Sequence, residues 1–226
     1  MNWESEGFLL SKRKFRENAS IVDVFTEKYG KVTGIIYGGT SRKVRNYLQI
    51  LNKIFVFYNS KNPNRPGYFK TELVQAISPK YFNDKERTTA LLSISSILKS
   101  LLPESQPHNF LYQSLIDLMK NYDEKNWYFF YIYWELNLIK QLGFDPNLSS
   151  FNNKNLDSES YSEVLIDDTK YKIPNYLITN EVPNLPNKDL IRRSLIFTRS
   201  IFLNKFFLQN NLIFPRSRVF LENYFN

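Results

Sequence analysis

The chain has 226 residues, of which 42% are hydrophobic and 16% aromatic, so a folded protein with an ordinary core is expected and disorder is excluded. It contains no cysteine and one histidine, which excludes disulfides, thiolate nucleophiles and cysteine-ligated zinc. The net charge of +8 favours an acidic partner, although a basic surface also serves solubility alone.

No membrane segment is expected. Residues 127–134 form the most apolar run, and they fall far short of the roughly 20 residues that cross a bilayer. The start, Met1–Gly7, carries two glutamates before any apolar run, which is wrong for a signal peptide. We therefore expect a cytoplasmic protein.

The first 80 residues are expected to be strands. Phe69, Thr71 and Leu73 alternate with charged residues, which is the spacing of a half-buried strand. Little room for helix remains beyond Ser41–Leu51, so the segment predicts a small five-stranded barrel. The five runs are Gly7–Arg13, Ser20–Thr26, Lys31–Gly38, Asn52–Asn59 and Tyr68–Ile77.

After Pro79 the apolar spacing becomes helical. Asn83 with Glu86 predicts the cap of a first helix, which Pro103 ends. A second helix is expected from Pro107, and a third from about Lys125 to a C-cap at Gly143. The residues of the third helix expected to face inward are Trp127, Phe130, Trp134 and Leu138.

Residues 145–187 are rich in Asn, Ser and Pro, and short strands are expected only at Glu163–Ile166 and Lys170–Ile173. A long final helix begins at Asn187–Lys188, and a short amphipathic segment follows Pro215. The fold class is thus α+β, with a barrel domain at 1–80 and a helical domain at 81–226. The apolar stripe expected on the final helix is Ile191, Leu195, Thr198, Phe202 and Phe206.

Catalytic motifs are missing from the sequence. His108 stands at the start of a predicted helix. A capping or surface role explains a lone histidine there better than membership of a catalytic triad. The spacing of Gly34 and Gly39 resembles a phosphate-binding loop, but Thr40 replaces its lysine. Asp167-Asp168 falls in a turn, where paired acids meet solvent. The sequence predicts a protein that is not an enzyme and needs no cofactor.

Charge is distributed unevenly along the chain. Residues 1–80 hold 14 Lys and Arg against 6 Asp and Glu, a net +8. Residues 81–187 have a net charge of −5, and residues 188–226 a net +5. A surface for a polyanion is therefore expected from the two ends of the chain.

Two basic clusters lie in the barrel segment, one at the end of the first strand and one after Gly38-Gly39. In a five-stranded barrel the first and third strands are expected to be neighbours in the central binding face, so the clusters could converge on one groove that tracks single-stranded nucleic acid. Tyr29, Tyr37 and Tyr47 are candidates for stacking on bases, although each alone reads more simply as core or rim. The candidate DNA-binding residues are Lys12, Arg13, Lys14, Arg16, Arg42, Lys43 and Arg45.

Arg192, Arg193 and Arg199 form a second basic region on the final helix, where positions 192 and 199 share a face. They are further DNA-binding candidates and could instead receive an acidic peptide. A solvated basic face explains them equally well.

Several segments, in order, resemble the RecO family of bacterial recombination mediators. Glu6–Leu10 and Gly38–Arg42 resemble its N-terminal signature, and Trp134–Leu136 with Leu142–Pro146 resembles the helix that leads into its zinc module. The ending, around Phe206-Phe207 and Arg216–Leu221, is similar to the family's C-terminus.

The resemblance implies an N-terminal OB-fold, an α-helical domain and a small zinc-ribbon-like insertion. It implies binding to single- and double-stranded DNA (ssDNA and dsDNA) at the nucleoid and annealing of complementary strands. It further implies a RecR-like partner, contact with the acidic tail of single-strand-binding protein, and, indirectly, loading of RecA.

One departure from the family is clear. Where many members place four cysteines, this chain has Ser149, Ser150 and Phe151, so the insertion at about 149–186 is expected to be a degenerate, metal-free hairpin and loop. Two alternatives stay open: an OB-fold module for single-stranded RNA, and a basic scaffold for protein interactions.

Overall fold

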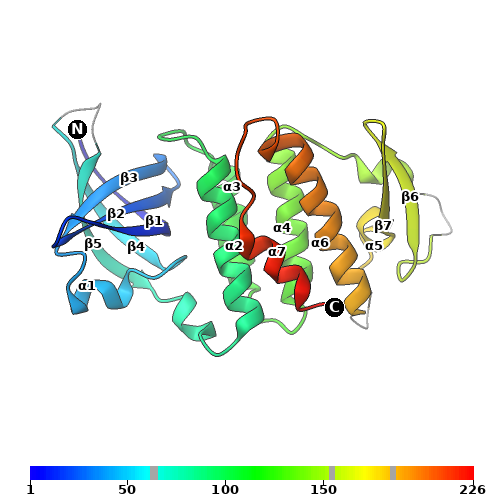
Figure 1. The fold of residues 1–226 in the computed structure, drawn as a ribbon, viewed down its shortest axis with the longest axis horizontal. Coiled ribbons are helices and arrows are strands. Elements are labelled where there is room, and N and C mark those ends of the chain that lie inside the picture. Colours follow the sequence, from blue (N-terminus) through cyan, green and yellow to red (C-terminus); the bar gives the residue numbers. More distant parts are fainter. Residues whose placement is uncertain (62–65, 153–155, 184–186) are drawn as a thin grey trace. The chain divides into compact units, whose positions relative to one another are not determined.

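The structure is a computed structural model that describes residues 1–61, 66–152, 156–183 and 187–226. The chain forms two compact units (Figure 1). The first is Met1–Gln113 with Pro215–Arg218, and the second is Ser114–Phe214 with Val219–Asn226. No helix among these residues is long and apolar enough to cross a membrane.

The first unit is built on a closed barrel of five strands in the order β1-β2-β3-β5-β4. All neighbouring pairs are antiparallel except β3 with β5. A short helix, α1 (Arg42–Tyr47), connects β3 to β4. The barrel and its fold class, an OB-fold followed by helices, are confirmed. The strands are β1 (Asn2–Phe15), β2 (Ala19–Thr26), β3 (Gly30–Tyr37), β4 (Lys53–Asn59) and β5 (Gly67–Gln75).

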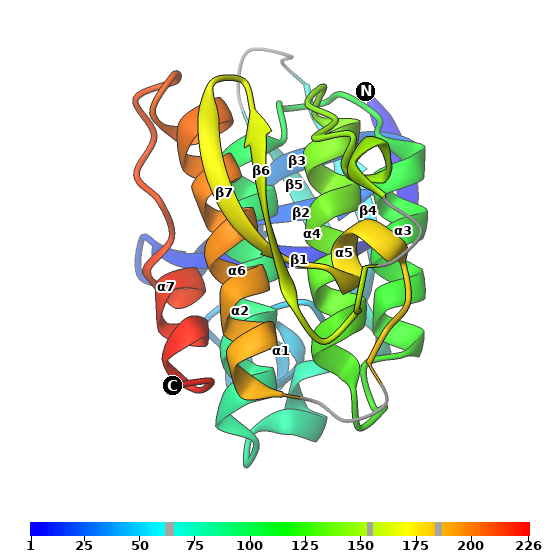
Figure 2. The same ribbon diagram turned by 90° about the vertical axis from the view of Figure 1, so that its right-hand side faces the viewer.

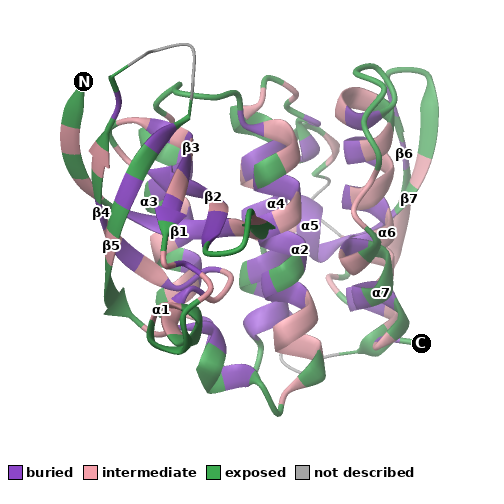
Figure 3. Ribbon diagram, turned by 60° about the vertical axis from the view of Figure 1, so that its left-hand side comes forward, coloured by how far each residue is buried: buried purple, intermediate pink, exposed green. Residues whose placement is uncertain are grey.

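Alternate residues of these strands fill the barrel, as the buried and exposed bands of Figure 3 show. Gly34 is part of strand β3 and so does not belong to a phosphate-binding loop. A Cβ at this position would lie 2.4 Å from the ring of Phe69. The glycine thus lets a buried phenylalanine fill the barrel. The core side chains are Leu9, Val22, Val24, Val32, Ile36, Leu48, Ile54, Val56 and Phe69.

Two strands extend differently from the expectation. β1 begins at Asn2, five residues before the predicted start, because Asn2–Phe8 pairs with β4. In β5 Phe69 is buried and Thr71 half-buried, but Leu73 is 45% exposed. The pairing of β4 with β5 shifts register just beyond Leu73, so the expected alternation fails at this end.

The barrel is followed by η1 (Ser78–Tyr81), α2 (Lys85–Leu101) and α3 (Asn109–Lys120). The predicted cap of α2 is wrong by one residue, because Asp84 and not Asn83 accepts the hydrogen bond from the Arg87 amide. The backbone carbonyl of His108 accepts from the amide of Tyr112, which is the first helical hydrogen bond of α3, so this histidine stands at the start of the helix as expected. The α2 helix belongs to the same compact unit as the barrel, and a domain boundary at residue 80 stays a prediction.

The second unit contains α4 (Trp127–Gln141) and α6 (Lys188–Phe202), which pack on each other (Figure 2). Glu135 is fully buried on α4 and accepts hydrogen bonds from the hydroxyl groups of Tyr131, at 2.7 Å, and Thr198, at 2.6 Å. The carboxylate thus ties the two helices together. The other elements are η2 (Leu148–Phe151), α5 (Tyr176–Thr179), η3 (Leu203–Phe207) and α7 (Arg216–Asn223).

Two expected core residues are misplaced in this unit. Phe130 is 38% exposed, because it lies on the outward side of α4 while residues on both sides of it in sequence are buried. The final helix widens to a π-helical turn at η3, which adds a residue to the turn. Phe207 is therefore fully buried there, and Phe206 is only half-buried.

The predicted hairpin of the insertion is confirmed as β6 (Tyr161–Ile166) paired with β7 (Thr169–Pro174). Asp167 and Asp168 form its turn, and Asp167 is ion-paired with Lys205 at 2.5 Å. Within the described ranges, no group of three or more His, Cys, Asp or Glu could hold a metal ion. Likeness to a zinc ribbon stays a prediction, and residues 153–155 and 184–186 of the insertion lie outside the described ranges.

Candidate nucleic-acid interface

The two basic clusters of the barrel lie side by side. The loop after β1 and the loop after β3 are joined by a hydrogen bond from the Gly38 amide to the Asn18 carbonyl, at 2.7 Å. A second bond, at 3.2 Å, joins the hydroxyl group of Thr40 to the side chain of Asn18. These bonds join the loop that begins at Arg16 to the loop that ends just before Arg42.

The expected reason for this convergence is wrong. The strand order places β2 between β1 and β3, so the first and third strands are not neighbours. The clusters meet through their loops and through α1, which packs against the barrel by way of Val44 and Tyr47. The hydroxyl group of Ser41 caps α1 by accepting from the Val44 amide.

Lys12 links the two clusters directly. Its half-buried ammonium group donates to the backbone carbonyl of Leu48, just after α1, at 2.9 Å. Burial and, second, the charge of Arg45 lower the pKa of Lys12. An ammonium group has three donors, so Lys12 both anchors α1 and keeps donors for a ligand.

The seven cations, called here the barrel cations, are nearly all exposed: of the seven only Lys12 is half-buried. None of them forms an ion pair with a carboxylate of the described residues. By contrast, Lys53 of β4 is held 2.5 Å from Glu6. Because the barrel cations are exposed or half-buried and are not ion-paired in this way, their charge is available to phosphates. They are Lys12, Arg13, Lys14, Arg16, Arg42, Lys43 and Arg45.

Two tyrosines extend this surface on the outward face of the barrel. Strand pairing places Arg13 in one cross-strand row with Ile21, Ile35 and Tyr68. Tyr37, two residues after Ile35, stacks on Tyr68 with ring centroids 5.2 Å apart. The two rings are 63% and 46% exposed, and their hydrogen bond raises the pKa of Tyr37. We call this pair the tyrosine platform.

The other two tyrosine candidates have structural positions. Tyr29 stacks on Trp3, with ring centroids 4.1 Å apart, and packs against the core. The hydroxyl group of Tyr47 donates to the backbone carbonyl of Thr71 at 2.8 Å. The sequence did not indicate Tyr68 as a stacking residue. Its position beside Tyr37 depends on the pairing of β3 with β5, which no local pattern reveals.

The arginines of α6 are in a different situation. Arg193 is ion-paired with Asp189 at 2.8 Å, and Arg199 is ion-paired with the buried carboxylate of Glu222 at 2.8 Å. Arg192 is half-buried and lies close enough to Asp189 to lower the pKa of that carboxyl group, though less than the hydrogen bonds that Asp189 accepts. A DNA-binding role for these three residues stays a prediction.

Comparison with known proteins identifies the family. Models described as recombination protein O N terminal and recombination protein O C terminal match residues 1–77 and 83–164. The DNA repair protein RecO of Wolbachia sp. subsp. Drosophila simulans is 32% identical over 152 residues, and that of Cereibacter sphaeroides is 31% identical over 149 residues. Each match covers 66% of this chain and 62% of the relative, so the chain spans less than two thirds of these relatives.

Among solved structures, asparaginyl-tRNA synthetase from Entamoeba histolytica aligns with 95% of this chain and 59% of its own, at 10% identity and a TM-score of 0.32. The two family models together cover the barrel and the following region as far as residue 164. They agree with the resemblance of several segments, in the same order, to this family. The chain belongs to the RecO family.

Proposed function

We propose that this protein is a DNA-binding recombination mediator in DNA repair, with no catalytic activity of its own. The observation that carries the proposal is the set of barrel cations beside the tyrosine platform, which two joined loops gather and which have no carboxylate partner within the described parts of the chain. A basic surface with exposed aromatic rings is the arrangement by which OB-folds bind single-stranded nucleic acid. The relatives' name, DNA repair protein RecO, favours DNA as the ligand.

The proposed action is annealing without covalent chemistry. Two complementary strands repel each other through their phosphates, and Lys and Arg side chains lower that repulsion by replacing the counterions of both strands. The guanidinium groups of Arg42 and Arg45 and the ammonium group of Lys43 can contact one backbone, while Tyr37 stacks on a base. The same cations can contact duplex phosphates, so both ssDNA and dsDNA are proposed ligands.

The proposed partners follow from the family. They are a RecR-like protein, the acidic tail of single-strand-binding protein and, indirectly, RecA, which the protein helps to load on coated strands. Because the proposed ligand is chromosomal DNA, the proposed location is the cytoplasm, at the nucleoid. The ion-paired arginines of α6 make that helix a less favoured receptor for an acidic tail than its sequence suggests.

Annealing of complementary oligonucleotides tests the proposal, measured with and without single-strand-binding protein across a salt series. We expect fast annealing that slows as salt rises and that is lost when Arg42, Lys43 and Arg45 are changed to Ala. An RNA strand of the same sequence serves as a competitor. Tight binding of RNA with no annealing of DNA would refute the mediator function and favour the RNA-binding alternative.

A further inference from the structure

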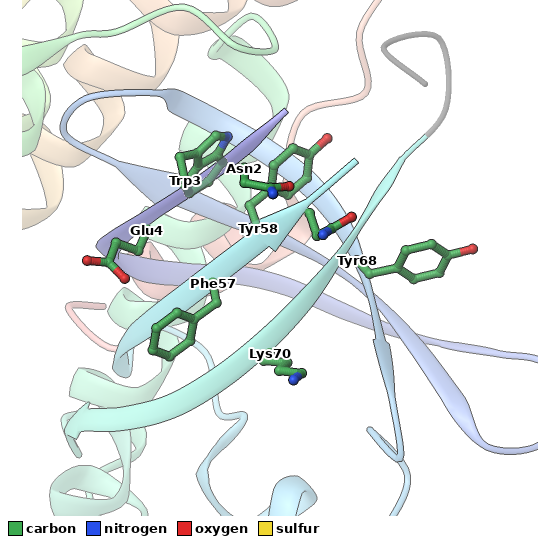
Figure 4. A pocket seen from close by; sticks show the side chains of 8 residues that line it. Asn2, Trp3, Glu4, Phe57, Tyr58, Tyr68 and Lys70 are labelled. Atoms are coloured by element: carbon green, nitrogen blue, oxygen red, sulfur yellow. The ribbon is translucent and has the colours of Figure 1, made fainter. Parts of the chain in front are cut away.

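A pocket of about 750 Å³ opens on the outward face of β1, β4 and β5 (Figure 4). Its size lies within the range of small-molecule sites. Two cross-strand rows of side chains build its floor, one row running Asn2–Asn59–Tyr68 and the next Glu4–Phe57–Lys70. Neighbours in such rows stand about 5 Å apart, so the six side chains form one continuous surface.

The pocket adjoins the tyrosine platform, because Tyr68 belongs to both. A strand that follows the barrel cations and stacks on Tyr37 therefore reaches the pocket on the far side of Tyr68. Lys70, two residues further along β5, is exposed and lines the same pocket without a carboxylate partner among the described residues. It can hold the phosphate that follows.

One wall of the pocket is rigid. Trp3 stacks with Tyr29 and with Tyr58, at ring-centroid distances of 4.1 and 4.7 Å. The rings of Trp3, Tyr29 and Tyr58 also pack against the barrel core. Figure 4 shows Phe57 and Tyr58 on opposite sides of β4, so Phe57 faces the open part of the pocket while Tyr58 supports the wall.

The chemistry of the lining fits a flat, neutral, polar-edged ring. Phe57 and Tyr68 are 40% and 46% exposed and offer faces for stacking. The amide groups of Asn2 and Asn59 provide both donors and acceptors for the edge of a base. The carboxylate of Glu4 repels a phosphate, which excludes the strand's backbone from the interior and leaves it at the rim with Lys70.

We infer that this pocket takes one unpaired nucleobase of the bound strand, turned away from the backbone path. The inference rests on the proposed function, since it assumes a strand on the barrel cations. A paired base cannot stack there, so the pocket gives the barrel a preference for single strands.

The test compares two probes: an oligothymidylate of about 16 nucleotides, the upper end of one OB-fold's site size, and an abasic strand of equal length. Phe57→Ala should weaken binding of oligothymidylate about 5- to 100-fold, the range for loss of one stacked base. It should leave binding of the abasic strand unchanged. Lys70→Ala should weaken both probes alike, because a phosphate contact does not depend on a base.

Matched variants separate stacking from general damage. Phe57→Tyr keeps a ring and should restore binding, while Phe57→Leu keeps an apolar side chain and should not. Phe110→Ala removes an aromatic ring that is 78% exposed on α3 and should change neither probe. Because Phe57 also packs edge-to-face on Phe55, with ring centroids 4.9 Å apart, Phe57→Ala should lower the melting temperature slightly, and binding is compared at a temperature at which both proteins are folded.

The outcomes distinguish this inference from the proposed function. If the wild type binds neither probe at low salt, the proposed DNA-binding function is refuted. If it binds both, but Phe57→Ala weakens neither probe or weakens the two equally, the nucleobase pocket is refuted and the DNA-binding function stands.

Discussion

Replacing Arg42, Lys43 and Arg45 together with Ala should reduce the salt dependence of ssDNA binding by a calculable amount. All three side chains are exposed on α1, and none is ion-paired with a carboxylate of the described residues. Each phosphate contact on a single strand contributes about 0.7 to the slope of log K against log salt concentration. Loss of three contacts should therefore lower the magnitude of the slope by about 2.

The same slope sets the change in affinity. Between about 50 and 200 mM salt, a slope difference of about 2 changes the ratio of wild-type to variant affinity by roughly 20-fold. The variant's disadvantage should thus be large at low salt and should shrink by that factor at high salt. Fluorescence anisotropy of a labelled oligothymidylate across this range measures both quantities.

A charge-matched control replaces Lys120, Lys140 and Lys205 with Ala. Each of these lysines is ion-paired, with Asp117 at 2.9 Å, Asp145 at 2.7 Å and Asp167 at 2.5 Å. Their removal takes away the same net charge but no free cation, so the slope should stay near that of the wild type. Equal slopes for both triple variants would refute the assignment of phosphate contacts to α1.

Three further outcomes are expected. Gly34→Ala places a Cβ against the buried ring of Phe69 and should lower the free energy of unfolding by about 1–3 kcal/mol in urea titration; an unchanged midpoint would contradict the packing. Burial raises the pKa of Asp23, but hydrogen bonds from two hydroxyl groups together with the nearby ammonium group of Lys99 outweigh it and hold that pKa below its usual value. The stabilisation is thus present at neutral pH and lost as pH falls below about 4, so the stability deficit of Asp23→Asn should shrink there; a constant deficit would refute this linkage. Tyr161→Phe removes a hydrogen bond to Asp189 and should speed amide exchange in β6 and β7 while exchange in the barrel stays unchanged.

The sequence predicts those parts of the fold that depend on local spacing. The five strands, the hairpin and the start of α6 each carry a periodic pattern of about one element's length, so the sequence predicts all of them, although β1 begins five residues before its predicted start. The pairing of strands is not local, which is why β2 was not expected between β1 and β3. The widened turn at η3 changes the buried face by one residue, from Phe206 to Phe207, and no pattern in the sequence signals it.

The candidate site shows the same division. Clustering along the chain identifies the barrel cations, but not which cations are neutralised. Asp189 stands four residues before Arg193, a spacing that indicates a helical ion pair and could have been read from the sequence. Glu222 is distant in sequence from Arg199, so that ion pair had no local signal. Phe57 and Lys70 become pocket residues only through strand pairing.

The second unit shows how the insertion is held without cysteines. Tyr161 of β6 donates a hydrogen bond to Asp189 and lies 5.1 Å, centroid to guanidinium carbon, from Arg193. Lys205 pairs with Asp167 in the hairpin turn. Arg193, one of the three arginines that the sequence offers for DNA on α6, thus has a carboxylate and an aromatic partner and stabilises the hairpin instead. Since none of the barrel cations is ion-paired with a carboxylate of the described residues, the salt dependence of DNA binding should come mainly from the barrel, and changing Arg193 to Ala should alter hairpin stability more than the salt slope.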